Sequence, residues 1–96
     1  MWLIYQDRLK AVNMDNLTKM GIDEGRYRVE GSPLKATLYA YIQAKDVRLD
    51  IGSFFTYEEA QKELANIMSD LSMGKTYHVV KDVMEMDVKE WRDDSN

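Results

Sequence analysis

His78 is the only histidine in the chain and the first residue to consider for acid–base or metal chemistry. A transition-metal site needs several ligands, and a single histidine without any cysteine does not provide the usual set. A histidine that works as a general base also needs a nucleophile and an orienting acid, which the sequence does not place beside it. We therefore predict a structural or surface histidine, and neither a metal ion nor a cofactor.

Carboxylates are the second source of chemistry. Glu58, Glu59 and Glu63 lie close together in one predicted helix, and a pair of carboxylates can act as general acid and base. Capping and the helix dipole explain acidic residues in a first helical turn equally well. We therefore predict no catalytic residues. A small enzyme is the least favoured class, and a deep pocket that holds His78 beside two carboxylates would indicate it.

The segment Gly74-Lys75-Thr76 matches the end of a phosphate-binding loop. That motif needs an earlier glycine at the position of Ser69, and it must lead into a helix whose N-terminus faces the phosphate. Here the segment follows a predicted helix, so we expect no phosphate site.

Two tyrosines offer a binding surface instead. Tyr39 and Tyr41 alternate along the longest predicted strand and share one face of it, opposite Leu38, Ala40 and Ile42. If the helix covers the Leu38 side, both tyrosines face outward on an open sheet, near Arg48, with Trp2, Tyr5 and Tyr27 as candidate neighbours on adjacent strands. Two alternatives bury them: a sheet that curls into a small barrel, or a C-terminal segment that covers this face.

An outward tyrosine face suits a protein partner, because tyrosine and arginine are enriched at interface hot spots. The same pattern would also stack single-stranded bases. Methionines and a tryptophan of the C-terminal segment add adaptable apolar area. The candidate protein-binding residues are Tyr39, Tyr41, Arg26, Arg28, Met84, Met86 and Trp91.

Short strands must position these residues. Polar and glycine-containing turns separate short apolar or alternating runs, and the short connections indicate an antiparallel meander of five or six strands, strongly twisted or barrel-like. The predicted extended segments are 2–5, 9–14, 17–22, 26–31, 36–44 and 47–51, with Gly52 ending the last.

One main helix, at about residues 56–73, is predicted to pack on this sheet and complete an α+β domain. Thr56 and Glu59 form a capping box at its start, and Gly74 closes it in a left-handed C-terminal cap. The apolar stripe that should cover the sheet is Ala60, Leu64, Ile67, Met68 and Leu71.

The C-terminal segment is ambiguous between strand and helix. Residues 77–80 are β-like in composition. Val80, Val83, Met84, Val88 and Trp91 would line one face of a helix, whereas Met84, Met86 and Val88 also alternate as in a strand. We predict a short strand and then a second helix, in a single domain at 1–92 whose residues 75–92 form a C-terminal extension, with a frayed acidic tail at 93–96.

Charge restricts the class of partner. The net charge of −4 divides into +2 over residues 1–48 and −6 over residues 49–96. Nucleic-acid binding depends largely on neutralising phosphates, so an acidic chain predicts no nucleic-acid partner. The sequence shows neither a leader pattern nor an apolar run of about twenty residues, which predicts a cytoplasmic protein without membrane contact.

Two segments resemble a group of small proteins from Gram-positive bacteria and their phages, most of which have no assigned function. The first is Val12-Asn13-x-Asp15-Asn16-Leu17, and the second is a strand ending at Gly52 that runs into Thr56-x-x-Glu59-Ala60. The resemblance covers about residues 1–72. It implies a bacterial or phage cytoplasmic protein with a β-meander followed by a helix.

The favoured function is a non-enzymatic protein-interaction module. Its partner is another protein or a second copy of the chain, a homodimer joined through the C-terminal segment or the tyrosine face. The alternative is a phage-encoded inhibitor whose acidic half, with the Asp and Glu residues of 82–94 on one face, docks on a basic host protein that handles nucleic acid.

Overall fold

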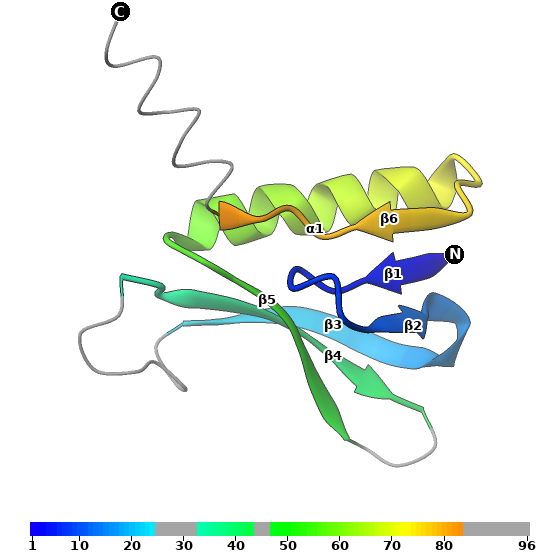
Figure 1. The fold of residues 1–96 in the computed structure, drawn as a ribbon, viewed down its shortest axis with the longest axis horizontal. Coiled ribbons are helices and arrows are strands. Elements are labelled where there is room, and N and C mark those ends of the chain that lie inside the picture. The colour runs from blue at the N-terminus through cyan, green and yellow to red at the C-terminus, as the bar shows by residue number, and fades with distance from the viewer. Residues whose placement is uncertain (25–32, 44–46, 84–96) are drawn as a thin grey trace, which may run out of the picture.

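The fold contains two small sheets and one long helix (Figure 1). The computed structural model describes residues 1–24, 33–43 and 47–83, and these form six strands, one 3-10 helix and one α-helix. In chain order the elements are β1 (Trp2–Ile4), β2 (Ala11–Asn13), η1 (Met14–Asn16), β3 (Leu17–Glu24), β4 (Ala36–Ile42), β5 (Arg48–Phe54), α1 (Tyr57–Ser72) and β6 (Tyr77–Val79).

The strands divide between two three-stranded sheets. One has the order β3-β4-β5 and is antiparallel throughout. The other has the order β2-β1-β6, with β1 antiparallel to β2 and parallel to β6. The predicted α+β class is therefore confirmed. The short C-terminal strand predicted at 77–80 appears as β6, which pairs parallel to β1. In the described part of the chain the two sheets do not close into the predicted barrel-like layer.

The chain passes from one sheet to the other through η1. Asn13 ends β2, and its side-chain oxygen accepts a hydrogen bond from the Asp15 N–H at 3.0 Å, which caps the 3-10 turn. The predicted strand at 9–14 is shorter than expected, because the Leu9 N–H bonds to the Asp7 side chain at 2.9 Å and leaves Leu9 in a turn. At the other sheet, β5 continues through Gly52 to Phe54.

The ends of α1 agree with the prediction. Thr56 is the N-cap and accepts a hydrogen bond from the Glu59 N–H at 3.1 Å. Glu59 Oε2 does not take part in a capping box, because it is buried without a hydrogen-bond partner in the described ranges. At the C-terminus Gly74 has a φ of +75°, and the N–H groups of Gly74 and Lys75 bond to the carbonyls of Leu71 and Asp70. These bonds form a Schellman motif.

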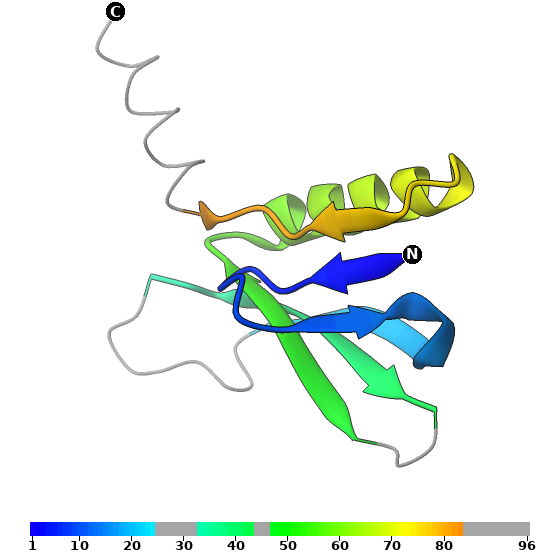
Figure 2. The same ribbon diagram turned by 45° about the vertical axis from the view of Figure 1, so that its right-hand side comes forward.

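The buried face of α1 differs from the predicted stripe. The buried residues are Ala60, Glu63 and Ile67, whereas Met68 and Leu71 are 43% and 40% exposed. The reason is that α1 contacts both the β3-β4-β5 sheet and β6, which lies along the helix in Figures 1 and 2. The helix therefore turns Glu63 inward, toward β6, and leaves Met68 and Leu71 at its margin.

The main core lies between α1 and the two sheets. Leu38 and Ala40 of β4 are fully buried, as expected for the strand face that the helix covers. The largest fully buried side chains come from β1, β4, β5, α1 and the residue after β6, so all five parts of the chain share this core. They are Leu3, Leu38, Ile51, Phe54, Ile67 and Val80.

Gln6 joins the two sheets along the edge of β5. Its backbone N–H donates to the Ile51 carbonyl at 3.0 Å, and its side-chain amide bonds to both the N–H and the carbonyl of Ser53, each at 2.9 Å. The same amide donates to the Lys81 carbonyl at 3.0 Å. Gly52 permits this approach, because a Cβ there would lie 3.2 Å from Gln6 Cβ and 3.1 Å from Val80 Cγ1. Gln6 thus takes the place of a neighbouring strand.

We predict that Gln6→Ala lowers the free energy of unfolding by about 2 kcal/mol, because it leaves the partly buried N–H and carbonyl of Ser53 unsatisfied and removes the exposed bond to the Lys81 carbonyl. Urea denaturation followed by circular dichroism measures this loss. The control is Gln61→Ala on the exposed side of α1, which should change stability little. Equal midpoints for the two variants would contradict the role of Gln6.

Candidate functional site

The outer face of the β3-β4-β5 sheet carries the predicted tyrosines. Tyr39 lies opposite Gly21 of β3 and Asp50 of β5, and Tyr41 lies opposite Lys19 and Arg48. The two rings meet edge to face, with centroids 5.7 Å apart and planes at 87°. Both residues are half-buried and point away from the buried Leu38 and Ala40. The tyrosines are therefore accessible from the side of the sheet that faces away from α1.

Cations and carboxylates hold these rings in place. The Arg48 guanidinium lies 4.4 Å from the centroid of the Tyr39 ring, and Lys19 Nζ lies 5.1 Å from that of Tyr41. Arg48 Nη1 is 2.9 Å from Asp23 Oδ2, and its Nε is 2.8 Å from Asp50 Oδ1. Since the Arg48 and Asp23 side chains are only 15% and 20% exposed, this ion pair is partly shielded from water.

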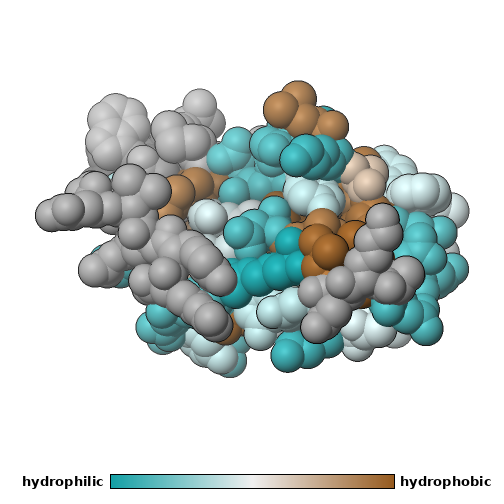
Figure 3. Space-filling view, turned by 90° about the horizontal axis from the view of Figure 1, so that it is seen from below, coloured by the Kyte–Doolittle hydropathy of each residue, from teal (hydrophilic) through white to brown (hydrophobic). Residues whose placement is uncertain are grey.

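We call this surface the tyrosine face, and it consists of Lys19, Asp23, Tyr39, Tyr41, Arg48 and Asp50. Figure 3 views the molecule from this side and shows strongly hydrophilic residues next to intermediate and hydrophobic ones. Tyrosine and arginine are enriched at protein interfaces, whereas lysine and aspartate are depleted at their centres.

Most of the other predicted site residues are not among those that the structure describes. Arg26, Arg28, Met84, Met86, Trp91 and Tyr27 fall outside the described residues. Trp2 lies in β1 and Tyr5 just after it, so neither is on a strand adjacent to β4, and Tyr5 is buried in the core. The sheet prediction placed them close by assuming one continuous meander.

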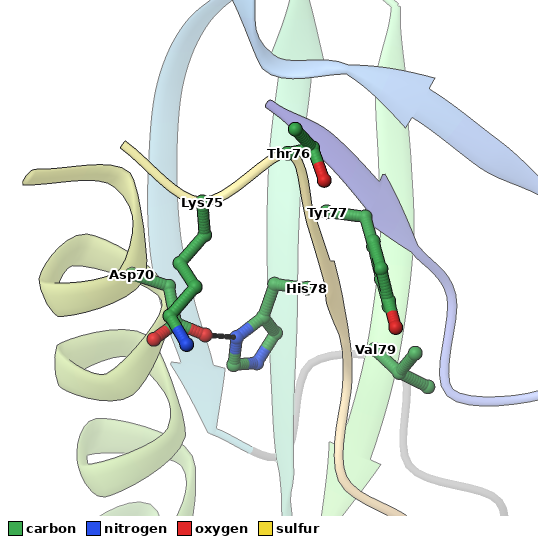
Figure 4. Close-up of a pocket in the computed structure, with 6 residues that line it drawn as sticks. All are labelled: Asp70, Lys75, Thr76, Tyr77, His78 and Val79. Carbon is green, nitrogen blue, oxygen red and sulfur yellow. Dashed lines mark hydrogen bonds and ion pairs between the residues drawn. The ribbon is translucent and has the colours of Figure 1, made fainter. Parts of the chain in front are cut away.

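A second cluster surrounds His78 on β6 (Figure 4). Its Nδ1 lies 2.6 Å from Asp70 Oδ2, and its Nε2 lies 3.0 Å from Glu63 Oε2, so two α1 carboxylates hold the ring from both sides. Glu63 is 2% exposed. Its Oε2 also accepts from the Lys81 N–H at 2.7 Å, and its Oε1 accepts from Asn66 Nδ2 at 3.3 Å.

The protonated form of His78 fits this arrangement. Burial alone would lower the pKa of the imidazole, but hydrogen bonds to Glu63 and Asp70, and the negative charges of both, outweigh it and raise the pKa above its usual value. Only the doubly protonated ring can donate from both nitrogens at once. The cluster is therefore a salt-bridged contact between α1 and β6.

The chemistry available to His78 is restricted by the same contacts. A recess of about 410 Å³ lies beside the ring, lined by Asp70, Lys75, Thr76, Tyr77, His78 and Val79. His78 thus lies beside two carboxylates, the arrangement that would indicate an enzyme. Both ring nitrogens are bound to those carboxylates, however, so neither presents a lone pair to a substrate. No three-residue group suited to a metal ion occurs among the described His, Asp and Glu residues.

The sequence did not reveal Glu63 and Asp70 as partners of His78. Glu63 is grouped above with the carboxylates near the helix start, and Asp70 lies outside the predicted apolar stripe. A signal for Glu63 was present, because it lies three residues after Ala60 and four before Ile67 and so shares their face. An acidic residue on the apolar face needs a nearby cation or donor.

Comparisons with protein-family models, curated proteins and solved structures gave no match to this chain. The resemblance to small proteins of Gram-positive bacteria and phages thus stays a prediction. In the described residues no helix has the length and apolar character of a membrane span.

We predict that the wild-type protein loses stability, relative to His78→Gln, as the pH rises above about 6.5 and through the raised pKa of His78. The folded pKa of His78 lies above the unfolded value, so protonation stabilises the fold fully below about pH 6.5, and this contribution disappears as the pH rises through the folded pKa. Urea denaturation at a series of pH values measures the difference in free energy of unfolding between the two proteins. This difference reports on His78 alone, because it is the only histidine.

The matched control is Lys62→Gln, which removes one positive charge from an exposed position of α1. Its stability should follow the wild-type pH profile. Parallel profiles for the wild type and His78→Gln would show that the His78 cluster does not contribute to stability through its charge.

Proposed function

We propose that the protein is a non-enzymatic interaction module that binds another polypeptide through the tyrosine face. The observation that carries this proposal is the position of Arg48, which stacks on Tyr39 while Asp23 and Asp50 fix its guanidinium group. Side chains that are ordered before binding lose less conformational entropy when a partner arrives. Tyrosine and arginine truncations are also those that most often weaken interfaces.

A polypeptide fits this face better than single-stranded nucleic acid. Base stacking requires an open aromatic face, and Arg48 and Lys19 already lie over the rings of Tyr39 and Tyr41. Carboxylates of Asp23 and Asp50 stand beside the same cations and would repel phosphates. A partner with mixed polar and charged side chains can instead bond to both signs of charge.

Two other functions have less support. An enzyme that uses His78 would first have to break one of its two carboxylate contacts, at 2.6 Å and 3.0 Å. The phage-encoded inhibitor depends on acidic residues of 82–94, of which the structure describes only Asp82, in an ion pair with Arg8 at 3.7 Å. We propose neither.

We predict that immobilised wild-type protein retains specific proteins from a lysate of a Gram-positive bacterium, and that Tyr41→Ala and Arg48→Ala retain more than about tenfold less. The matched control is Tyr57→Ala, which removes a tyrosine that is 37% exposed at the start of α1. Quantitative mass spectrometry of the retained proteins provides the comparison. Equal retention by all four proteins would refute binding through the tyrosine face.

A further inference from the structure

Among the described residues, no strand pairs with the outer edge of β3. β3 has eight residues and, in the described part of the chain, pairs with β4 alone. By contrast, Gln6 bonds to the backbone of Ile51 and Ser53 on the edge of β5, and β2 and β6 have only three residues each. A long free edge presents a row of N–H and C=O groups that another strand can pair with.

The sequence of β3, LTKMGIDE, is complementary to itself in antiparallel orientation. When two copies are aligned about Gly21, Lys19 of each lies opposite Asp23 of the other. Met20 then lies opposite Ile22, and Thr18 opposite Glu24. Directly opposed residues in antiparallel strands interact most strongly, and opposite charges and apolar pairs stabilise the pairing. A lysine on an edge strand usually prevents association, but here each lysine meets a carboxylate.

The charged pairs fall on the outer face of the sheet, and the apolar pairs fall on its inner face. Lys19 and Asp23 lie opposite Tyr41 and Thr37 of β4, on the outer face, where Lys19 is exposed. Met20 and Ile22 lie opposite the buried Ala40 and Leu38, on the inner face. The charged pairs would therefore remain near water, and the apolar pairs would extend the core side of the sheet.

An apolar groove borders this edge on the inner side. It has a volume of about 240 Å³ and lies between β3 and the exposed margin of α1. Its lining residues are Met14, Leu17, Thr18, Lys19, Met20, Met68 and Leu71. Inner-face side chains of an added strand would reach this groove, and Met68 and Leu71 would become covered. When an extended strand adds to a free sheet edge, pockets beside that edge receive every second side chain of the added strand.

Gly21 at the centre of the edge connects it to the tyrosine face. A Cβ at this position would lie 2.6 Å from the Tyr39 hydroxyl oxygen, so the tyrosine covers the middle of β3 because glycine leaves room. In an antiparallel pair centred on Gly21, the Tyr39 hydroxyls of both copies come close to the two-fold axis.

We propose that the occupant of this edge is a second copy of the chain, paired antiparallel along β3 with Gly21 at the two-fold axis. The result is a continuous six-stranded sheet in a symmetric dimer with two Lys19–Asp23 contacts. This inference rests on the proposed function, since it names a partner for the edge of the same sheet. An unrelated extended peptide would have no reason to match both charges of β3.

The test measures the mass of the full chain by sedimentation equilibrium over a range of concentrations. We expect a dimer of the 11.2 kDa chain. Lys19→Glu and Asp23→Lys should each weaken dimerisation about tenfold or more, because each creates two like-charged pairs. An equimolar mixture of the two variants should restore the dimer, because the glutamate introduced at position 19 of one variant then faces the lysine introduced at position 23 of the other, while the unchanged Asp23 and Lys19 face each other.

Lys62→Glu is the matched control, because it makes the same change of charge on an exposed residue of α1. It should dimerise as the wild type does. Circular dichroism shows whether each variant is folded, and recovery of the dimer in the mixture excludes misfolding as the cause of the loss.

The inference would be overturned if the chain stays monomeric up to about 1 mM, because a dissociation constant above this concentration is weaker than those of specific protein association. So would a dimer that both single variants leave unchanged, or a mixture that does not recover. The outcome of the lysate experiment is distinguishable from that of the dimer test, because it compares protein retention by the Tyr41→Ala and Arg48→Ala variants. A monomer that still captures proteins through Tyr41 would refute the dimer and support the proposed function.

Discussion

A buried carboxylate determines where the C-terminal strand lies. Glu63 is 2% exposed, and a buried charge is strongly unfavourable unless it is paired and hydrogen-bonded. Its partners His78 and Lys81 both come from the segment that follows the helix. Separating this segment from α1 would leave the carboxylate without them. Because β6 also pairs with β1, Glu63 connects the helix to the sheet β2-β1-β6.

The same contact fixes the rotation of the helix and so shapes the surface on its other side. Turning Glu63 toward β6 directs Ala60 and Ile67 into the core and places Met68 and Leu71 at the border with β3. The apolar groove beside β3 therefore follows from an electrostatic requirement on the opposite side of the helix. A helix rotated to bury the predicted stripe would cover Met68 and Leu71 and expose Glu63.

Local signals in the sequence predicted the helix and the longer strands. They did not predict contacts between residues that are distant in the sequence. Thr56 and Gly74 mark the helix ends through bonds to residues only a few positions away. Alternation at Leu38, Tyr39, Ala40 and Tyr41 was enough to separate the two faces of β4. The parallel pairing of β6 with β1 and the strand-like role of Gln6 join residues more than forty positions apart. No periodic pattern encodes such contacts.

Asp23 belongs to both the edge and the face of the β3-β4-β5 sheet. Its Oδ2 binds Arg48, which in turn lies over Tyr39. A carboxylate can accept several hydrogen bonds, so Asp23 is able to hold Arg48 within its own chain and a lysine of a second copy at once. Pairing at the edge would then further restrict the carboxylate that orients Arg48, although two cations that share one carboxylate each bind it less strongly than one cation alone. A lysine of a second copy at the β3 edge would therefore share Asp23 with Arg48, so the edge and the tyrosine face meet at one carboxylate.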